Sequence, residues 1–159
     1  MINLKFDEEC FIFIDFDDTI CGRNTDLFNK LMEENKFDEA FKLPKVLLPG
    51  IKNFFNLLHE NKISNIYIVT KNEDTESIIE ILEKCGIYNQ IKKILTQRNE
   101  IINGKTKTIW KGQIIKEFLK DKNKDKNLTI YFFDDIDVNV KNVKNELFYY
   151  KNLYCYLVQ

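Results

Sequence analysis

Short apolar runs alternate with amphipathic segments along this chain. Residues 11–14, 66–69 and 128–133 are mostly β-branched and aromatic, a pattern typical of strands buried on both faces of a parallel sheet. Over residues 51–58 and 78–85, apolar side chains recur three and four positions apart, which is typical of a helix lying on a sheet. Strands that alternate with helices predict an α/β fold: a doubly wound, Rossmann-like parallel sheet sandwiched by helices.

Two segments interrupt this alternation. Asp15 and Thr70 lie about 55 residues apart, whereas a simple strand–helix–strand unit takes roughly 30. The surplus predicts a small helical insertion after the first strand, at about residues 24–48. Further on, Asn103 and Gly104 stand between short alternating segments and predict a β-hairpin turn. This hairpin comes just before a helix that begins at Lys111.

Length and charge narrow the classes of protein to which the chain could belong. Its 159 residues are expected to form one domain, residues 1–159, with a single core. The 24 basic and 25 acidic residues give a net charge of -1, so neither nucleic acid nor an anionic membrane is indicated as a partner. The apolar run behind the N-terminal acids is too short for a signal peptide or a membrane span. We expect a soluble, cytoplasmic protein.

The cysteines do not suggest a metal site. No two of Cys10, Cys21, Cys85 and Cys155 have C-x-x-C spacing, and the chain has one histidine to share a zinc ion with them. We expect structural thiols in a reducing compartment. Cys21 is expected to be the exception, because it follows Asp15 by only a few residues and could be accessible near a site.

Polar side chains follow three of the predicted strands, and they are Asp15 with Asp17, Thr70 with Lys71, and Asp134 with Asp135. In open α/β sheets ligands bind outside the carboxyl ends of the strands, so these side chains are expected at one crevice. A single acid after a strand is as often a helix cap or a turn former. Two acid pairs after the two most apolar strands indicate a functional site.

Several carboxylates in one place need a compensating charge, and Mg²⁺ is the cation that such oxygen ligands suit. A Mg²⁺ site beside a threonine hydroxyl and a lysine ammonium could hold a phosphate group. Lys111 is the favoured lysine, because a helix start at the edge of a sheet is a fixed position. Lys105 and Lys107 in the hairpin are the alternatives, and Arg23 is a second candidate for a phosphate contact.

These residues resemble the four motifs of the haloacid dehalogenase (HAD) superfamily of aspartyl phosphohydrolases, over nearly the whole chain. The motifs are Asp15-Phe-Asp17-Asp-Thr19, Thr70, Lys111 and Asp134-Asp135, in that order. The resemblance implies that Asp15 is the nucleophile and forms an aspartyl-phosphate, with Asp17 as general acid and base. It implies that the Asp15 carboxylate, the Asp17 backbone carbonyl and Asp134 bind Mg²⁺, with Asp135 acting directly or through water. Thr70, Lys71 and Lys111 are then the phosphate-binding residues.

The resemblance implies a Mg²⁺-dependent phosphomonoester hydrolase. Asp17 argues against dehalogenation, because a halide leaves without a proton whereas an alkoxide needs one. The insertion at 24–48 is short for a cap, which favours a bulky phosphomonoester, with a phosphoprotein as first candidate, or a neighbouring subunit that acts as a lid.

Two alternatives stay open. One is a small-metabolite or nucleotide phosphatase of the same superfamily. The other is a non-hydrolytic phospho-acceptor or a binding module on the same fold. In a receiver domain, however, the threonine and the lysine come after both acid positions, whereas here Thr70 and Lys111 precede the second acid pair.

Overall fold

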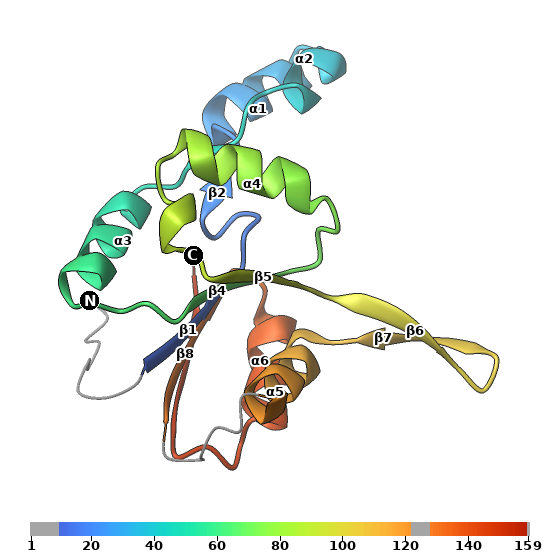
Figure 1. Cartoon of the computed structure of the whole chain (residues 1–159). Coiled ribbons are helices and arrows are strands. Elements are labelled where there is room, and N and C mark those ends of the chain that lie inside the picture. Colours follow the sequence, from blue (N-terminus) through green and yellow to red (C-terminus); the bar gives the residue numbers. More distant parts are fainter. Residues whose placement is uncertain (1–9, 122–127, 159) are drawn as a thin grey trace.

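The computed structural model describes residues 10–121 and 128–158 (Figure 1). Five parallel strands form the central sheet in the order β5-β4-β1-β8-β9. They are β1 (Cys10–Ile14), β4 (Ile66–Thr70), β5 (Lys93–Thr96), β8 (Thr129–Asp134) and β9 (Asn152–Leu157). The predicted parallel α/β sheet is therefore confirmed. The N-terminal residues 1–9, on which the expected location partly rests, lie outside the described residues.

Helices cover both faces of the sheet. On one face lie α3 (Ile51–Glu60) and α4 (Thr75–Lys84), and on the other lie α5 (Lys111–Asp121) and α6 (Asp137–Glu146) (Figure 1). Because side chains alternate along a strand, Ile12 and Ile14 pack with α3 and α4, whereas Phe11 and Phe13 pack with α5 and α6. All residues of β1 are buried, which explains its uninterrupted apolar sequence.

The strand register brings three strand ends to one edge. Ile14 of β1 lies opposite Ile68 of β4 on one side and Phe133 of β8 on the other. The backbone N–H of Asp15 continues the ladder by donating to the Phe133 carbonyl at 2.9 Å. Asp15, Thr70 and Asp134 therefore leave the sheet at the same edge.

The predicted insertion is present between β1 and α3. The short strands β2 (Cys21–Gly22) and β3 (Val46–Leu47) pair in antiparallel fashion at its base, and α1 (Thr25–Glu33) and α2 (Phe37–Phe41) lie beyond them. Asn35, at φ 59°, turns the chain between the two helices. In Figure 1 these helices stand beyond α4, away from the sheet, and their described residues bury only Ala40.

The predicted hairpin is also present. Strands β6 (Arg98–Ile102) and β7 (Lys105–Ile109) pair around Asn103 and Gly104, whose positive φ angles of 52° and 75° suit a tight hairpin turn. The ribbon projects away from the central sheet (Figure 1). A short 3-10 helix, η1 (Tyr88–Gln90), leads into β5. None of the described helices has both the length and the apolar surface needed to cross a bilayer.

Candidate active site

A tight turn after β1 positions the first acid. The Phe16 carbonyl accepts hydrogen bonds from the backbone N–H groups of Thr19, Ile20 and Cys21 at 3.3, 3.0 and 3.2 Å. The turn also places Asp18 in the left-handed region, at φ 60°, a conformation that aspartate tolerates better than most residues. As a result, Asp15 is held at the strand end with 5% of its surface exposed.

Lys111 joins two acids that lie far apart in the sequence. Its Nζ donates to Asp15 Oδ1 and to Asp134 Oδ2, both at 2.7 Å. Lys111 is 1% exposed, and a buried ammonium requires such partners. Lys105 and Lys107 are instead exposed on the hairpin. Of the three candidate lysines, the structure therefore brings Lys111 to the acids.

Two further polar side chains hold the acids in place. The Thr19 hydroxyl lies 3.2 Å from Asp15 Oδ2 and 3.4 Å from Asp135 Oδ1, so its single hydrogen can serve either carboxylate. Asn139 in the first turn of α6 donates from Nδ2 to both Asp134 oxygens, at 3.3 and 3.2 Å. Sequence reasoning gave Asn139 no role. The available signal was a polar residue one turn into the helix that follows the second acid pair.

Asp15, Asp134 and Asp135 form an acid cluster that fits a divalent cation. Each offers a carboxylate oxygen, and these three oxygens lie within 4.8 Å of one another. Two Mg²⁺ ligands on opposite sides of the ion stand about 4 Å apart, so a small inward movement of the side chains is sufficient. Three carboxylates against the one ammonium of Lys111 leave negative charge to be neutralised. Both the chemistry and the spacing of these donors suit Mg²⁺.

The electrostatic state of Asp15 reflects its burial. Desolvation raises its pKa from the ordinary value of 3.8 to about 7, Lys111 opposes this rise, and the nearby Asp134 carboxylate adds to it. Burial disfavours the charged form of a carboxyl group, whereas a cation favours it. A divalent ion in the acid cluster would therefore lower the pKa of Asp15 and favour its ionised form.

The Asp17 carboxylate lies outside the acid cluster. Its Oδ1 forms an ion pair with Nζ of Lys45, just before β3, and both side chains are partly exposed. Asp17 therefore stands at the mouth of the site, where its side chain can meet a substrate. Lys45 was missed by sequence reasoning, since it lies 28 residues away across the insertion and no local pattern connects it with Asp17.

The second predicted motif divides into a buried and an exposed residue. Thr70 is 1% exposed at the end of β4, and its Oγ1 accepts a hydrogen bond from the Asn72 backbone N–H at 3.1 Å. The hydroxyl thus keeps its own hydrogen for another acceptor. Lys71 is exposed, and its Nζ lies 5.5 Å from the centre of the Trp110 ring. The Lys71 ammonium thus lies over the aromatic ring of Trp110, the residue that precedes Lys111 in the sequence.

Comparisons with known proteins identify the fold. No family model and no curated protein matches this sequence. Among solved structures, a hydrolase from Streptococcus pneumoniae TIGR4 superposes with a TM-score of 0.62 at 11% identity, over 95% of this chain and 92% of that one. A HAD-superfamily hydrolase from Ehrlichia chaffeensis gives a TM-score of 0.55 at 14% identity, over 94% and 86% of the two chains. The chain has the HAD fold.

A third similar structure is the HAD domain of an effector protein. The HAD domain of the effector protein Lem4 from Legionella pneumophila superposes with a TM-score of 0.52 at 17% identity, over 95% of this chain and 86% of that domain. At these identities the likeness concerns the HAD fold, and the chemistry must be argued from the residues of this chain.

The prediction that Cys21 is accessible is wrong. Within this HAD fold, Cys21 is 0% exposed, because β2 turns back beneath the insertion and directs the side chain into the core beside α3 and α4. Burial, with the neighbouring Cys85 as a second cause, raises the pKa of the Cys21 thiol to about 12. The side chain is therefore a packed thiol and not a reactive one. All four cysteines are free.

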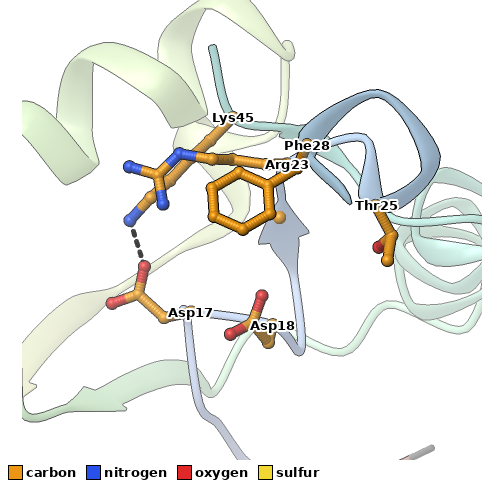
Figure 2. Close-up of a pocket in the computed structure, with 7 residues that line it drawn as sticks. Asp17, Asp18, Arg23, Thr25, Phe28 and Lys45 are labelled. Carbon is orange, nitrogen blue, oxygen red and sulfur yellow. Dashed lines mark hydrogen bonds and ion pairs between the residues drawn. The ribbon is translucent and has the colours of Figure 1, made fainter. Parts of the chain in front are cut away.

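A cavity of about 410 Å³ opens beside Asp17, between the motif-one turn of the HAD fold and the insertion. The residues that line it are Asp17, Asp18, Gly22, Arg23, Thr25, Phe28 and Lys45. Figure 2 shows Arg23 and Lys45 on the same side of the cavity, above Asp17, with the Phe28 ring next to them. Arg23, expected as a phosphate contact, thus lies with the residues around Asp17. Among the described residues its hydrogen bond goes to the Phe41 carbonyl and not to the acid cluster.

Proposed function

We propose that this chain is a Mg²⁺-dependent phosphomonoester hydrolase that works through an aspartyl-phosphate on Asp15. The observation that carries the proposal is the pair of 2.7 Å contacts from Lys111 to Asp15 and Asp134. With Asp135 close by, a buried carboxylate, a fixed ammonium and a set of oxygen ligands meet at one edge of the sheet. The HAD fold supports the same reaction class by analogy.

The first step transfers the phosphoryl group to the protein. An Asp15 oxygen forms a bond to phosphorus while the bond from phosphorus to the ester oxygen breaks. The Lys111 ammonium lies where it can balance charge on the phosphoryl oxygens, and the Thr70 hydroxyl can donate to one of them. Bound by Asp15, Asp134 and Asp135, Mg²⁺ supplies positive charge that favours attack by an anionic nucleophile.

Asp17 transfers a proton in each of the two steps. Its carboxyl group gives a proton to the leaving oxygen, and the resulting carboxylate then takes a proton from the water that hydrolyses the aspartyl-phosphate. General acid and base help of this kind is typically worth about 10²–10⁴-fold in rate. The partly exposed position of Asp17 beside the cavity supports this role, because a leaving group has to depart towards the open side of the site.

The insertion bears on the substrate. The residues of its two helices are mostly exposed, with only Ala40 buried among those described. A small insertion of this kind favours a bulky phosphomonoester, with a phosphoprotein as first candidate. The cavity supports a second candidate, a small-metabolite or nucleotide ester. Its volume of about 410 Å³ lies within the roughly 300–1,000 Å³ of small-molecule sites.

The test is hydrolysis of p-nitrophenyl phosphate by the purified chain, with Mg²⁺ and with EDTA. We expect multiple turnovers with Mg²⁺, none with EDTA, and a loss of at least about 10³-fold for Asp15→Asn, which removes the nucleophile. The exposed Asp26, on α1 and outside the site, provides a matched control, and Asp26→Asn should behave as wild type. Equal activity of Asp15→Asn and wild type would contradict the covalent mechanism.

Acid quenching with ³²P-labelled substrate separates hydrolysis from phospho-acceptance. A hydrolase should release inorganic phosphate in excess over protein, with a small hydroxylamine-sensitive label on the chain. A phospho-acceptor would take up one equivalent of label and release none, and a binding module would take up no label.

A further inference from the structure

The cavity beside Asp17 is lined by Arg23, a cation that has no anionic partner among the described residues. Arg23 forms one hydrogen bond among the described residues, from a terminal nitrogen to the Phe41 carbonyl at 3.5 Å, the outer limit for such a bond. Its Nε is buried and has no hydrogen-bond partner within residues 10–121 and 128–158. A buried donor left without an acceptor costs free energy, so the guanidinium is arranged for an acceptor that a ligand can bring.

The other charges around the cavity do not satisfy Arg23. Asp17 forms an ion pair with Lys45, so the charge of each of these two groups is already balanced by the other. Asp18 also lines the cavity and is exposed, and in Figure 2 its carboxylate is drawn farther from the Arg23 guanidinium than that of Asp17. No ion pair joins Arg23 to a carboxylate in the part of the chain that the structure describes.

One aromatic side chain, Phe28, lines the cavity beside Arg23. Phe28 packs edge-to-face against Phe41, with ring centroids 5.8 Å apart and an interplanar angle of 73°. The partly buried Phe28 ring lies next to Arg23 in Figure 2 and lowers the access of water to it on that side, which strengthens a charged contact that the guanidinium makes. A planar guanidinium also recognises carboxylate and phosphate groups through paired hydrogen bonds.

From these contacts, and resting on the proposed function, we infer that the Arg23 cavity binds a second anionic group on the leaving-group side of the substrate. The preferred substrate class is a phosphomonoester whose leaving group carries a carboxylate or a second phosphate near the ester. Asp17, which meets the leaving oxygen, lines the same cavity as Arg23. A group attached to that oxygen therefore enters the cavity when the phosphoryl group lies at Asp15.

A matched pair of substrates tests this inference. We would compare kcat/KM for 4-carboxyphenyl phosphate and 4-carbamoylphenyl phosphate, which have nearly the same shape and differ in charge. The carbamoyl compound has the better leaving group, so chemistry alone favours the neutral ester. Because hydrogen bonds to charged groups are worth more than about 1.4 kcal/mol, we expect the wild type to prefer the carboxylate by about tenfold or more.

Variants test whether Arg23 causes the preference for the carboxylate ester. In Arg23→Met, which keeps the bulk of the side chain, the preference should fall to about one or below, mainly through a higher KM for the carboxylate. Arg23→Lys should retain part of it. Lys42→Met removes an exposed charge from the same insertion and should keep the wild-type ratio. Circular dichroism and thermal melting would verify that the variants fold.

A second set of substrates, made of peptides, distinguishes two sources of the anionic group. Phosphotyrosyl peptides with glutamate or glutamine after the phosphotyrosine would show whether an acidic protein substrate uses Arg23, as opposed to a small acidic ester. Hydrolysis of both aryl esters with a ratio near one in the wild type would overturn the inference and leave the proposed function standing. Absence of hydrolysis with every ester and peptide in the presence of Mg²⁺ would overturn both.

Discussion

Lys111 is the residue on which the acid cluster depends for charge balance. Lys111→Met leaves the buried carboxylates of Asp15 and Asp134 facing each other without their shared ammonium. Because removing one partner of a buried ion pair leaves uncompensated charge, we expect the free energy of unfolding to fall by about 3–5 kcal/mol. Phosphatase activity should be lost as well. Urea denaturation in EDTA at about pH 8, above the raised pKa of Asp15, measures the stability change.

A neighbouring lysine on the same helix provides the control. Lys120 is exposed on α5, and Lys120→Met should change the free energy of unfolding by less than about 0.5 kcal/mol. If the two variants were equally stable, Lys111 would not be the counter-charge of the buried acids.

The raised pKa of Asp15 predicts how stability depends on pH. In the folded chain the carboxyl group keeps its proton up to about pH 7, whereas the unfolded chain releases it near 3.8. The folded state therefore binds more protons within this interval. It follows that Asp15 makes the free energy of unfolding fall as pH rises from about 4 to 7 in the absence of metal.

Asp15→Asn removes this titration, so the stability difference between wild type and variant should shift towards the variant as pH rises. Urea denaturation in EDTA across the interval measures the difference. Saturating Mg²⁺ should reduce the effect, because a cation favours the ionised carboxylate. A constant difference across the interval would mean that burial does not raise the pKa of Asp15.

At the residue scale, sequence reasoning succeeded where a side chain is placed by a strand end. Asp15, Thr70 and Asp134 could be assigned to one edge because each follows a buried apolar run. Lys45 could not be connected with Asp17, since their contact depends on how the insertion folds back. The burial of Cys21 was missed for the same reason: it depends on the pairing of β2 with β3.

At the scale of elements, α5 carries Lys111 into the site by packing closely on α6. A Cβ atom added at Gly112 would stand 2.7 Å from Asn142 Oδ1 and 2.8 Å from Glu146 Cβ. Gly112 N–H also donates to Asn142 Oδ1 at 2.8 Å. The close approach of the two helices thus requires glycine at position 112. Gly112 directly follows Lys111, the counter-charge of the buried acids.

Gly112→Ala should therefore push α5 away from α6 and displace Lys111. Overpacking of this kind typically costs about 1–3 kcal/mol. Under the proposed function kcat should fall more than KM changes, because the role proposed for Lys111 is at the reacting phosphoryl group. Denaturation and steady-state kinetics measure the two effects. Lys120→Ala on the same helix is the control, and an unchanged kcat in a folded Gly112→Ala protein would contradict this role of the contact.

Element types followed well from local patterns, whereas contacts between elements did not. The Asn103-Gly104 hairpin was predictable because its turn requires residues that accept positive φ, and the capping of α4 by Asp74, which accepts from Ser77 N–H at 3.2 Å, follows from the preference of aspartate for that position. The close contact at Gly112 was not predictable, since no local rule distinguishes it from a glycine that ends a turn.

At the scale of the whole molecule, the site exists only when the sheet is complete. Asp15 follows β1, Lys111 begins α5, and Asp134 ends β8, so the acid cluster joins segments from the two ends of the chain. No single element holds two of these three residues. A Mg²⁺ ion in the acid cluster would therefore bind to the folded state alone, which would link metal affinity to global stability.

This linkage predicts that Mg²⁺ raises the free energy of unfolding by about 2.7 kcal/mol when its concentration is 100 times its Kd. Loss of activity and loss of circular dichroism should then share one urea midpoint, and Mg²⁺ should move both together. Asp135→Asn removes one carboxylate from the acid cluster and should shrink the shift, whereas Asp26→Asn on the insertion should keep it. If Mg²⁺ stabilised Asp135→Asn as much as wild type, the ion would bind elsewhere, because a ligand cannot be lost from a site without a change in its affinity.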